Sequence, residues 1–211
     1  MGWIYQAGTQ VTQDYTEAMK WYRKAADQGV AIGEMNVGWM YQKGQGVQAD
    51  NAEALKWYLK AAAQGDMTAV RQVGTIYLKG DGVEANPAEG LKWSSLAAAQ
   101  GDTESQNNVG EIYLKGLGVQ QDYAQALGYF QKAAEKNNID AYANLGAMCQ
   151  NGWGVEQDNV EALKWYLLTS QAGNAAVNKT AIALEKQMTK EQIEEAKKRT
   201  ADWQAQHPNK P

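Results

Sequence analysis

Apolar and small residues recur along the chain with a period of 36 residues, which no insertion or deletion interrupts. The clearest marker of the period is a glycine at the same position of five successive units: Gly2, Gly38, Gly74, Gly110 and Gly146. Within a unit, apolar and small side chains fall at helical spacing, as at Ala69, Val73 and Ile76. A repeat of roughly 20 to 50 residues is typical of a stacked solenoid, in which each unit buries its apolar face against its neighbours. The pattern therefore predicts an all-α solenoid of about five helix-turn-helix repeats.

A glycine is expected to end the first helix of every unit. These glycines are Gly8, Gly44, Gly80, Gly116 and Gly152. Glycine takes the left-handed conformation that terminates a helix at little steric cost, and the lysines before three of them suit the negative end of the helix dipole. A second glycine follows in four units, as in residues 44–46. We interpret this Gly-x-Gly segment as a turn, because it follows a helix and lacks the Gly-Lys-Ser/Thr ending of a phosphate-binding loop.

A side-chain cap is expected to begin the second helix of every unit. The caps are Asp14, Asp50, Asn86, Asp122 and Asp158, and a Glu or Gln stands three residues after each. Acidic and amide side chains at such positions bond the free N–H groups of a first helical turn. Pro87 fixes the register, because proline is favoured at the first helical position and Asn86 must then be the cap. The second helices are expected to close at Gly29, Gly65, Gly101, Asn137 and Gly173.

The repeat pattern decays after the fifth unit, where Ile182 occupies the glycine site. Thr189 and Gln192 then have the spacing of a capping box, which predicts one last helix. We therefore expect a repeat array over residues 1–187, and a C-terminal capping helix with a frayed tail over residues 188–211, in which the tail runs from His207 to Pro211.

The N-terminal unit is expected to be truncated. Met1 aligns with Val37, so the first repeat begins in the middle of its first helix. A solenoid normally ends in a polar capping unit. The exposed edge of a truncated unit could therefore support self-association.

Composition narrows the class of function. The net charge is -4 and the charges of both signs are interleaved, so we expect no nucleic-acid partner. Cys149 and His207 are the single cysteine and histidine, which argues against a Cys/His metal site and an intramolecular disulfide. Cys149 stands where other units have a core tyrosine, so it is expected to be a buried, inert thiol. No apolar run approaches the roughly 20 residues of a membrane helix, so we expect no membrane insertion.

Two short motifs carry a resemblance to known repeats. Residues 37–41 (Val-Gly-Trp-Met-Tyr) and the spacing of Ala54 and Ala61 are similar to the tetratricopeptide motif. Four more residues separate these two parts than in that motif, and two fewer separate Ala61 from Gly74. With its Gly-x-Gly-Val and Ala-Ala-x-x-Gly segments, the chain resembles the Sel-one-like repeat family. The resemblance implies a right-handed α/α superhelix that serves as a scaffold or adaptor for other proteins, most often in bacteria, with no catalytic residues.

By resemblance to tetratricopeptide grooves, residues of the first helices line a concave face that binds partners. The candidate partner-binding residues on it are Trp3, Met35, Asn36, Trp39, Lys43, Arg71, Gln72, Lys79, Asn107, Asn108, Glu111, Lys115 and Asn144. Trp3 and Trp39 stand out, because repeat packing does not require them and tryptophan is enriched at binding hot spots. By contrast, we interpret the recurring tryptophans of the second helices, such as Trp21 and Trp57, as packing residues.

Alternative interpretations remain for the other candidates. The row of amides at Asn36 and its equivalents could hold a peptide backbone or could satisfy carbonyl groups between helices. The lysines that end the first helices could line the groove or simply be solvated. Trp153, between two loop glycines, could bind a partner at the loop edge or stack on its own loop.

These observations predict a non-catalytic scaffold or adaptor that binds a protein or peptide in the concave groove, with no cofactor. We find no cluster of titratable residues away from the capping positions, so we do not expect an enzyme. The alternative is a structural or regulatory module of a larger exported bacterial protein involved in host interaction. The family resemblance favours a periplasmic or secreted location.

Overall fold

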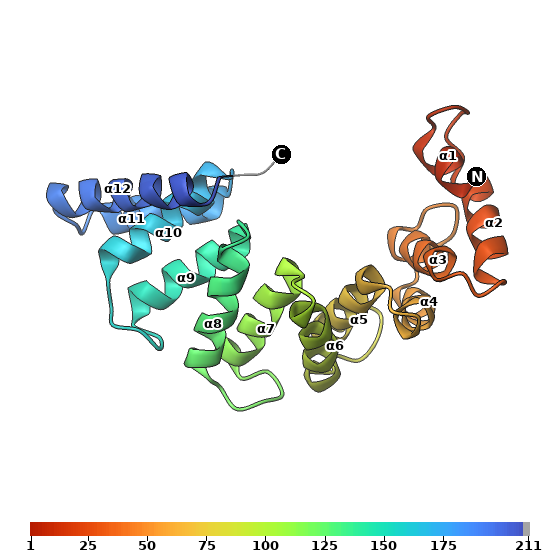
Figure 1. The fold of residues 1–211 in the computed structure, drawn as a ribbon, viewed down its shortest axis with the longest axis horizontal. Coiled ribbons are helices and arrows are strands. Elements are labelled where there is room, and N and C mark those ends of the chain that lie inside the picture. Colours follow the sequence, from red (N-terminus) through yellow and green to blue (C-terminus); the bar gives the residue numbers. More distant parts are fainter. Residues whose placement is uncertain (209–211) are drawn as a thin grey trace. The chain divides into compact units, whose positions relative to one another are not determined.

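The computed structural model describes residues 1–208, which form helices and contain no strand (Figure 1). Residues 209–211, part of the expected frayed tail, lie outside the described residues. The chain forms two compact units, of which the first ends at Gln100 and the second begins at Gly101. The helices of the first unit are α1 (Gly2–Ala7), α2 (Tyr15–Ala26), α3 (Ala31–Lys43), α4 (Asn51–Ala63), α5 (Met67–Lys79) and α6 (Pro87–Ala99). The helices of the second unit are α7 (Thr103–Lys115), α8 (Tyr123–Ala134), α9 (Ile139–Asn151), α10 (Asn159–Gln171), α11 (Ala175–Glu185) and α12 (Lys190–Gln206).

Each repeat is a pair of helices, and the pairs stack in sequence order within a unit. The first helix packs against the second in every pair, as α3 does against α4 and α9 against α10. The second helix also packs against the first helix of the following pair, as α2 does against α3 and α8 against α9. The prediction of an all-α helix-turn-helix array is therefore confirmed.

The predicted helix ends are also confirmed. The five capping side chains accept hydrogen bonds from backbone N–H groups at the starts of α2, α4, α6, α8 and α10. The glycines that end the first helices have φ between 65° and 70°, in the left-handed region. Asn137, with φ 61°, is the one non-glycine residue of positive φ within residues 1–208. Asparagine tolerates this conformation better than other side chains do.

The glycine that marks the period allows the two helices of a repeat to approach closely. A Cβ atom at Gly38 would lie 2.8 Å from the ring of Tyr58, and one at Gly146 would lie 2.5 Å from the ring of Tyr166. Real Cβ atoms do not come this close to another heavy atom, so a larger residue would push the helices apart. The aromatic ring thus fills the space that the glycine leaves.

The second loop glycine has a role that the interpretation as a simple turn did not include. A Cβ atom at Gly46 would lie 2.4 Å from the carbonyl oxygen of Tyr15, and one at Gly154 would lie 2.7 Å from the Cβ atom of Tyr123. These partners begin the second helix of the preceding repeat. The loop therefore packs directly on its neighbour, and glycine is required there for contact as well as for the turn.

The cores of the two units differ in continuity. The first unit has two separate clusters of buried residues, one around Met40 between α2 and α3 and one around Tyr58 and Val73. Within the described residues, the second unit has one cluster, which runs from Ala126 to Ala196 and includes Phe130, and the buried Val109 and Ile112 of α7 lie outside it.

The last helix begins with a capping box, and an aromatic contact holds it on the second unit. Thr189 and Gln192 form the predicted capping box. The ring of Trp203 meets that of Trp165 edge-on, with centroids 4.7 Å apart. His207, which we expected to begin the frayed tail, stacks on Trp203 with ring centroids 3.8 Å apart.

Candidate functional site

A cleft of about 610 Å³ in the first unit gathers the most exposed apolar side chains of the chain. We call it the N-terminal groove. Its lining residues come from α1, α2 and α3: Met1, Gly2, Trp3, Gln6, Trp21, Tyr22, Ala25, Ile32, Gly33, Met35 and Asn36. Trp3 and Ile32 each expose 62% of their surface. No charged side chain lines the groove, so what it offers a ligand is apolar surface with a few amide groups.

Close packing beneath the groove holds its walls in place. Gly33 lets α3 approach α2, because a Cβ atom there would lie 2.7 Å from the backbone nitrogen of Ala26. Gly2 does the same between α1 and Tyr22. The hydroxyl of Tyr22 donates a hydrogen bond to the side-chain oxygen of Gln6 over 2.5 Å, and burial raises the pKa of this phenol. The groove is therefore formed before any ligand binds.

The structure brings three of the predicted site residues together here. Trp3, Met35 and Asn36 all line the N-terminal groove, although Trp3 lies in a different repeat from the other two. The Asn36 amide nitrogen donates to the carbonyl oxygen of Ile32 over 2.7 Å. One of its two donors is thus engaged with a carbonyl of its own helix, α3, and not with a carbonyl between helices.

The other candidates in the first unit lie outside the groove. Trp39 is half-buried and packs against both core clusters, so it takes part in packing, and whether it also contacts a partner stays a prediction. Lys43 and Lys79 are exposed at the ends of α3 and α5, and Arg71 and Gln72 are half-buried on α5.

The candidates in the second unit form a polar network between α7 and α9. Asn144 donates a hydrogen bond to the side-chain oxygen of Asn107 over 2.9 Å, and Asn107 donates in turn to Glu111 over 3.1 Å. Lys115 pairs with the other oxygen of Glu111 at 2.6 Å. Asn107 is only 3% exposed, and Asn144, a member of the amide row, therefore joins α9 to α7 through a buried contact. Asn108 is half-buried beside the network.

Trp153 is also engaged within the chain. Its ring stacks on that of Tyr123, with centroids 6.2 Å apart and planes 7° from parallel, and it packs against the core of the second unit. The expected stacking partner was its own loop, whereas the observed partner is the first residue of α8. This contact occupies one face of the indole.

Sequence reasoning named only three of the residues that line the groove, and Ile32 and Trp21 are among those it missed. Ile32 carried a signal, because the equivalent positions in later repeats are polar: Thr68, Glu104 and Asp140. Trp21 was interpreted as a packing residue by analogy with later repeats. Its side chain is 36% exposed, whereas the equivalent Trp165 is 6% exposed.

Within residues 1–208, no three His, Cys, Asp or Glu side chains are grouped so that they could hold a metal ion. In the same residues, no helix has the length and apolar character to cross a membrane.

Comparison with protein families gives one match along most of the chain. The model of the Sel1 repeat matches residues 1–30, 31–66, 68–102, 103–138 and 139–174. No curated protein matches the chain.

Several solved structures are similar to this chain. One is c5321, a protective antigen of uropathogenic Escherichia coli with an SLR fold, at 33% identity and a TM-score of 0.90. That match covers 98% of this chain and 44% of c5321, so the chain spans less than half of that structure's length. A Sel1 repeat protein from Oxalobacter formigenes has 34% identity and a TM-score of 0.79, over 97% of this chain and 85% of that one. A putative Sel1 repeat protein from Klebsiella pneumoniae, at 20% identity and a TM-score of 0.53 over 85% of this chain and 88% of that one, shares the fold.

Proposed function

The chain belongs to the Sel1 repeat family, whose members are commonly protein-interaction scaffolds, and from this premise we propose that it is a non-catalytic adaptor that binds a protein or peptide in the N-terminal groove. The observation that carries the proposal is the exposure of Trp3 and Ile32, at 62% each, in one preformed cleft with Met35. Isolated apolar side chains on a surface need no explanation, but several in one cleft are typical of an interaction site.

The chemistry of the groove favours a partner segment with apolar side chains. Burial of apolar surface is the main driving force for such association, and Trp3 supplies a large and rigid contact surface. The amides of Gln6 and Asn36 lie at the same cleft and offer polar contacts for the backbone of a bound segment. The groove is therefore suited to a peptide that places apolar residues on one face.

Selection of displayed random peptides on the immobilised full chain tests this proposal. We expect enriched peptides with spaced apolar residues, and we expect Trp3→Ala to weaken their binding by about 2 kcal/mol, or roughly thirtyfold in Kd. Ile32→Ser is a second groove variant, and Leu96→Ser is its control because Leu96 is 46% exposed on α6, outside the groove. Equal binding by wild type, Trp3→Ala and Ile32→Ser, measured by calorimetry, would contradict the proposal.

A second candidate function is that of a module in a larger exported bacterial protein involved in host interaction. The similarity to c5321, a protective antigen more than twice as long as the matched region, supports it. Fractionation of cells that make the native full-length protein tests this candidate. Recovery of that protein from the cytoplasm alone would exclude it.

A further inference from the structure

The N-terminal groove lies where each of the four later repeats has a helical segment. In the first repeat α1 has 6 residues, whereas α3, α5, α7 and α9 have 13 each. These five helices end at equivalent glycines, so the difference in length lies at their N-terminal ends. It corresponds to about two helical turns, which residues 31–36 form in the second repeat.

In the second repeat these turns lie against the end of the second helix. The side-chain amide of Gln64, at the end of α4, donates a hydrogen bond to the Glu34 carboxylate in the first turn of α3 over 2.7 Å. Glu34 is only 6% exposed. Met35 packs against the core cluster that includes Ala61 of α4. A complete repeat therefore has a contact between two helices at this place.

The first repeat lacks these turns, and the surface that they would bury is open. Met1 is 65% exposed, whereas the equivalent Val37 is 0% exposed. Ala25 is half-buried, whereas its equivalents in the later repeats are 0% exposed: Ala61, Ala97, Ala133 and Thr169. Both Met1 and Ala25 line the N-terminal groove. The later repeats thus show that a helix is the kind of segment that buries this surface.

The amide of the groove also has an equivalent contact in a later repeat. Asn36 stands at the repeat position of Asn144. The Asn144 amide donates to the side-chain oxygen of Asn107, in the second turn of α7, over 2.9 Å. In the first repeat, the residue equivalent to Asn107 would belong to the turns that α1 lacks. Asn36 can therefore offer a bound helix the contact that Asn144 makes within the chain.

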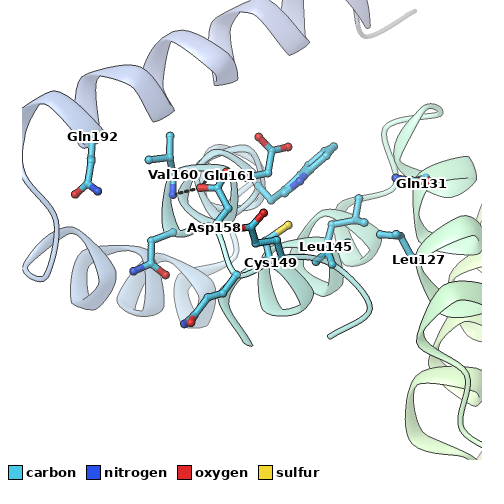
Figure 2. A pocket seen from close by; sticks show the side chains of 13 residues that line it. Leu127, Gln131, Leu145, Cys149, Asp158, Val160, Glu161 and Gln192 are labelled. Carbon is cyan, nitrogen blue, oxygen red and sulfur yellow. Dashed lines mark hydrogen bonds between the residues drawn. The ribbon is translucent and has the colours of Figure 1, made fainter. Parts of the chain in front are cut away.

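A larger cleft in the second unit differs from the N-terminal groove in both respects. It has a volume of about 760 Å³, and its lining includes Leu145, Asp158 and Glu161 (Figure 2). Leu145 stands at the repeat position of Met1 but is only 2% exposed. Arg199 pairs with both carboxylates, and Lys164 also pairs with that of Glu161. This cleft therefore offers a partner less open apolar surface than the N-terminal groove does.

This chain does not display a helix of its own that could fill the groove of a second copy. Among residues 1–208, the large apolar side chains that are exposed on helices other than α1 to α3 occur one to a helix: Met67, Leu96, Ile139 and Ile182. One such side chain on a helix is ordinary, and it cannot match a cleft that several apolar residues line. The helix is therefore expected to come from a different protein.

We propose that the N-terminal groove binds an amphipathic α-helix of a different protein, which lies on α2 and α3 in the place that the first two turns of a first helix take in later repeats. This inference rests on the proposed function and names the form of the bound segment. The helix would direct apolar side chains at positions i, i+3 and i+4 toward Trp3, Trp21 and Ile32, and an amide toward Asn36.

A peptide with the sequence of residues 66–72, which form the equivalent turns of the third repeat, is the probe. A lactam bridge between the side chains at positions 68 and 72 holds it helical. Nuclear magnetic resonance of the full chain should show saturable shifts of the indole N–H groups of Trp3 and Trp21 and of the backbone amides of residues 31–36. Failure of the bridged peptide to shift these signals would overturn the inference.

Two control peptides test the helical form and the apolar contact. The same peptide without the bridge should bind several-fold more weakly, because it must lose conformational freedom on binding. The bridged peptide with Val70→Asp should bind at least about tenfold more weakly, because it would place an unpaired charge in an apolar groove. Equal binding of all three peptides would overturn the inference. If displayed peptides bound at Trp3 in an extended form, the inference would fail and the proposed function would stand.

A fusion variant fills the groove from within the same chain. Residues 66–72 joined directly before Met1 would restore the turns that α1 lacks, so the fusion should raise the melting temperature and abolish binding of the bridged peptide. The same fusion with Val70→Asp is the matched control, and it should still bind the peptide. Unchanged peptide binding by the first fusion would overturn the inference.

Two measurements distinguish a different protein from other sources of the helix. A concentration-dependent dimer that Trp3→Ala disperses, seen by analytical ultracentrifugation, would assign the groove to a second copy of the chain. Binding of the bridged peptide to this chain but not to the native full-length protein would assign the groove to another segment of the same protein. Either result would overturn the inference, whereas a monomer and equal binding by both proteins would support it.

Discussion

At the scale of the residue, the two tryptophans of the first helices have different surroundings despite equivalent positions. Trp3 is 62% exposed in the N-terminal groove, whereas Trp39 is half-buried and packs against both clusters of the first unit. Their repeat positions alone do not distinguish them, because exposure depends on which side chains surround each position.

Replacement of these tryptophans should therefore have unequal effects on stability. Trp39→Ala should lower the free energy of unfolding by about 2–4 kcal/mol, because it removes packing in two clusters. Trp3→Ala should leave it nearly unchanged. Urea unfolding of both variants measures the difference, and equal losses would show that Trp3 is also a core residue.

Cys149 should make the stability of the protein depend on pH in the alkaline range. Burial, with a contribution from the Glu161 carboxylate, raises the pKa of the Cys149 thiol from 9.0 to about 11. Below about pH 9, the thiol keeps its proton in both the folded and the unfolded state. Between the two values only the unfolded chain loses the proton, so stability falls as the pH rises.

The size of this effect follows from the shift in pKa. From about pH 8 to about pH 10.5, wild type should lose about 2 kcal/mol more stability than Cys149→Ala, since one pKa unit corresponds to about 1.4 kcal/mol. Cys149→Ala is the reference because the buried tyrosines titrate in both proteins. Identical pH dependence in urea unfolding would mean that the thiol is solvated in the folded state.

At this scale the sequence predicted where a residue lies in the repeat better than it predicted which side chains surround that residue. Trp3, Met35 and Asn36, which the resemblance to tetratricopeptide grooves assigned to one face, line one cleft. The amides of Asn107 and Asn144 could not be assigned, because their partners lie on different helices and depend on side-chain direction. Whether any of these residues contacts a partner stays a prediction.

At the scale of the element, helix bounds followed from local chemistry, whereas contacts between elements did not. Caps and left-handed glycines act within a few residues of themselves, so their sequence signals are sufficient. The partner of the second loop glycine lies in the preceding repeat, as Tyr15 does for Gly46. No local pattern identifies such a partner.

Glycines within helices provide a test at this scale. Gly128 of α8 has open space where a Cβ atom would lie, so Gly128→Ala should stabilise the protein by about 0.5–1 kcal/mol through the lower entropy of the unfolded chain. Gly146→Ala should instead destabilise it by about 1–3 kcal/mol, because the new atom would lie 2.5 Å from the Tyr166 ring. Thermal unfolding of the two variants should give shifts of opposite sign. A lower melting temperature for Gly128→Ala would mean that a neighbouring group packs against this glycine.

At the scale of the whole molecule, the two units differ in how continuous their cores are. The first unit has two smaller clusters and begins with the six-residue helix α1. The second unit has one larger cluster, to which Trp203 of α12 adds. A continuous core opens less readily in parts, because each part is held by the rest.

We therefore expect the first unit to open more readily than the second. Hydrogen exchange measured by mass spectrometry, in increasing but subdenaturing urea, should show faster exchange in α1 to α3 than in α8 to α10. Trp165→Ala should reduce the difference in exchange rate between the two units, because it weakens the core of the second unit. Simultaneous exchange throughout the wild-type chain would show that all repeats unfold as one cooperative system.

The contact of each loop with the helix before it also limits how a gene for such a chain can change in length. Gly46, Gly82 and Gly154 each meet a residue about 31 positions earlier, and all three contacts have the same register. Recombination that adds or removes a complete repeat keeps every loop glycine opposite the start of the second helix in the preceding repeat. A deletion of part of a repeat would place a side chain where only glycine can lie. We therefore expect natural variants of this array to differ by whole repeats, with shorter changes confined to the region after the fifth repeat, where this contact is no longer repeated.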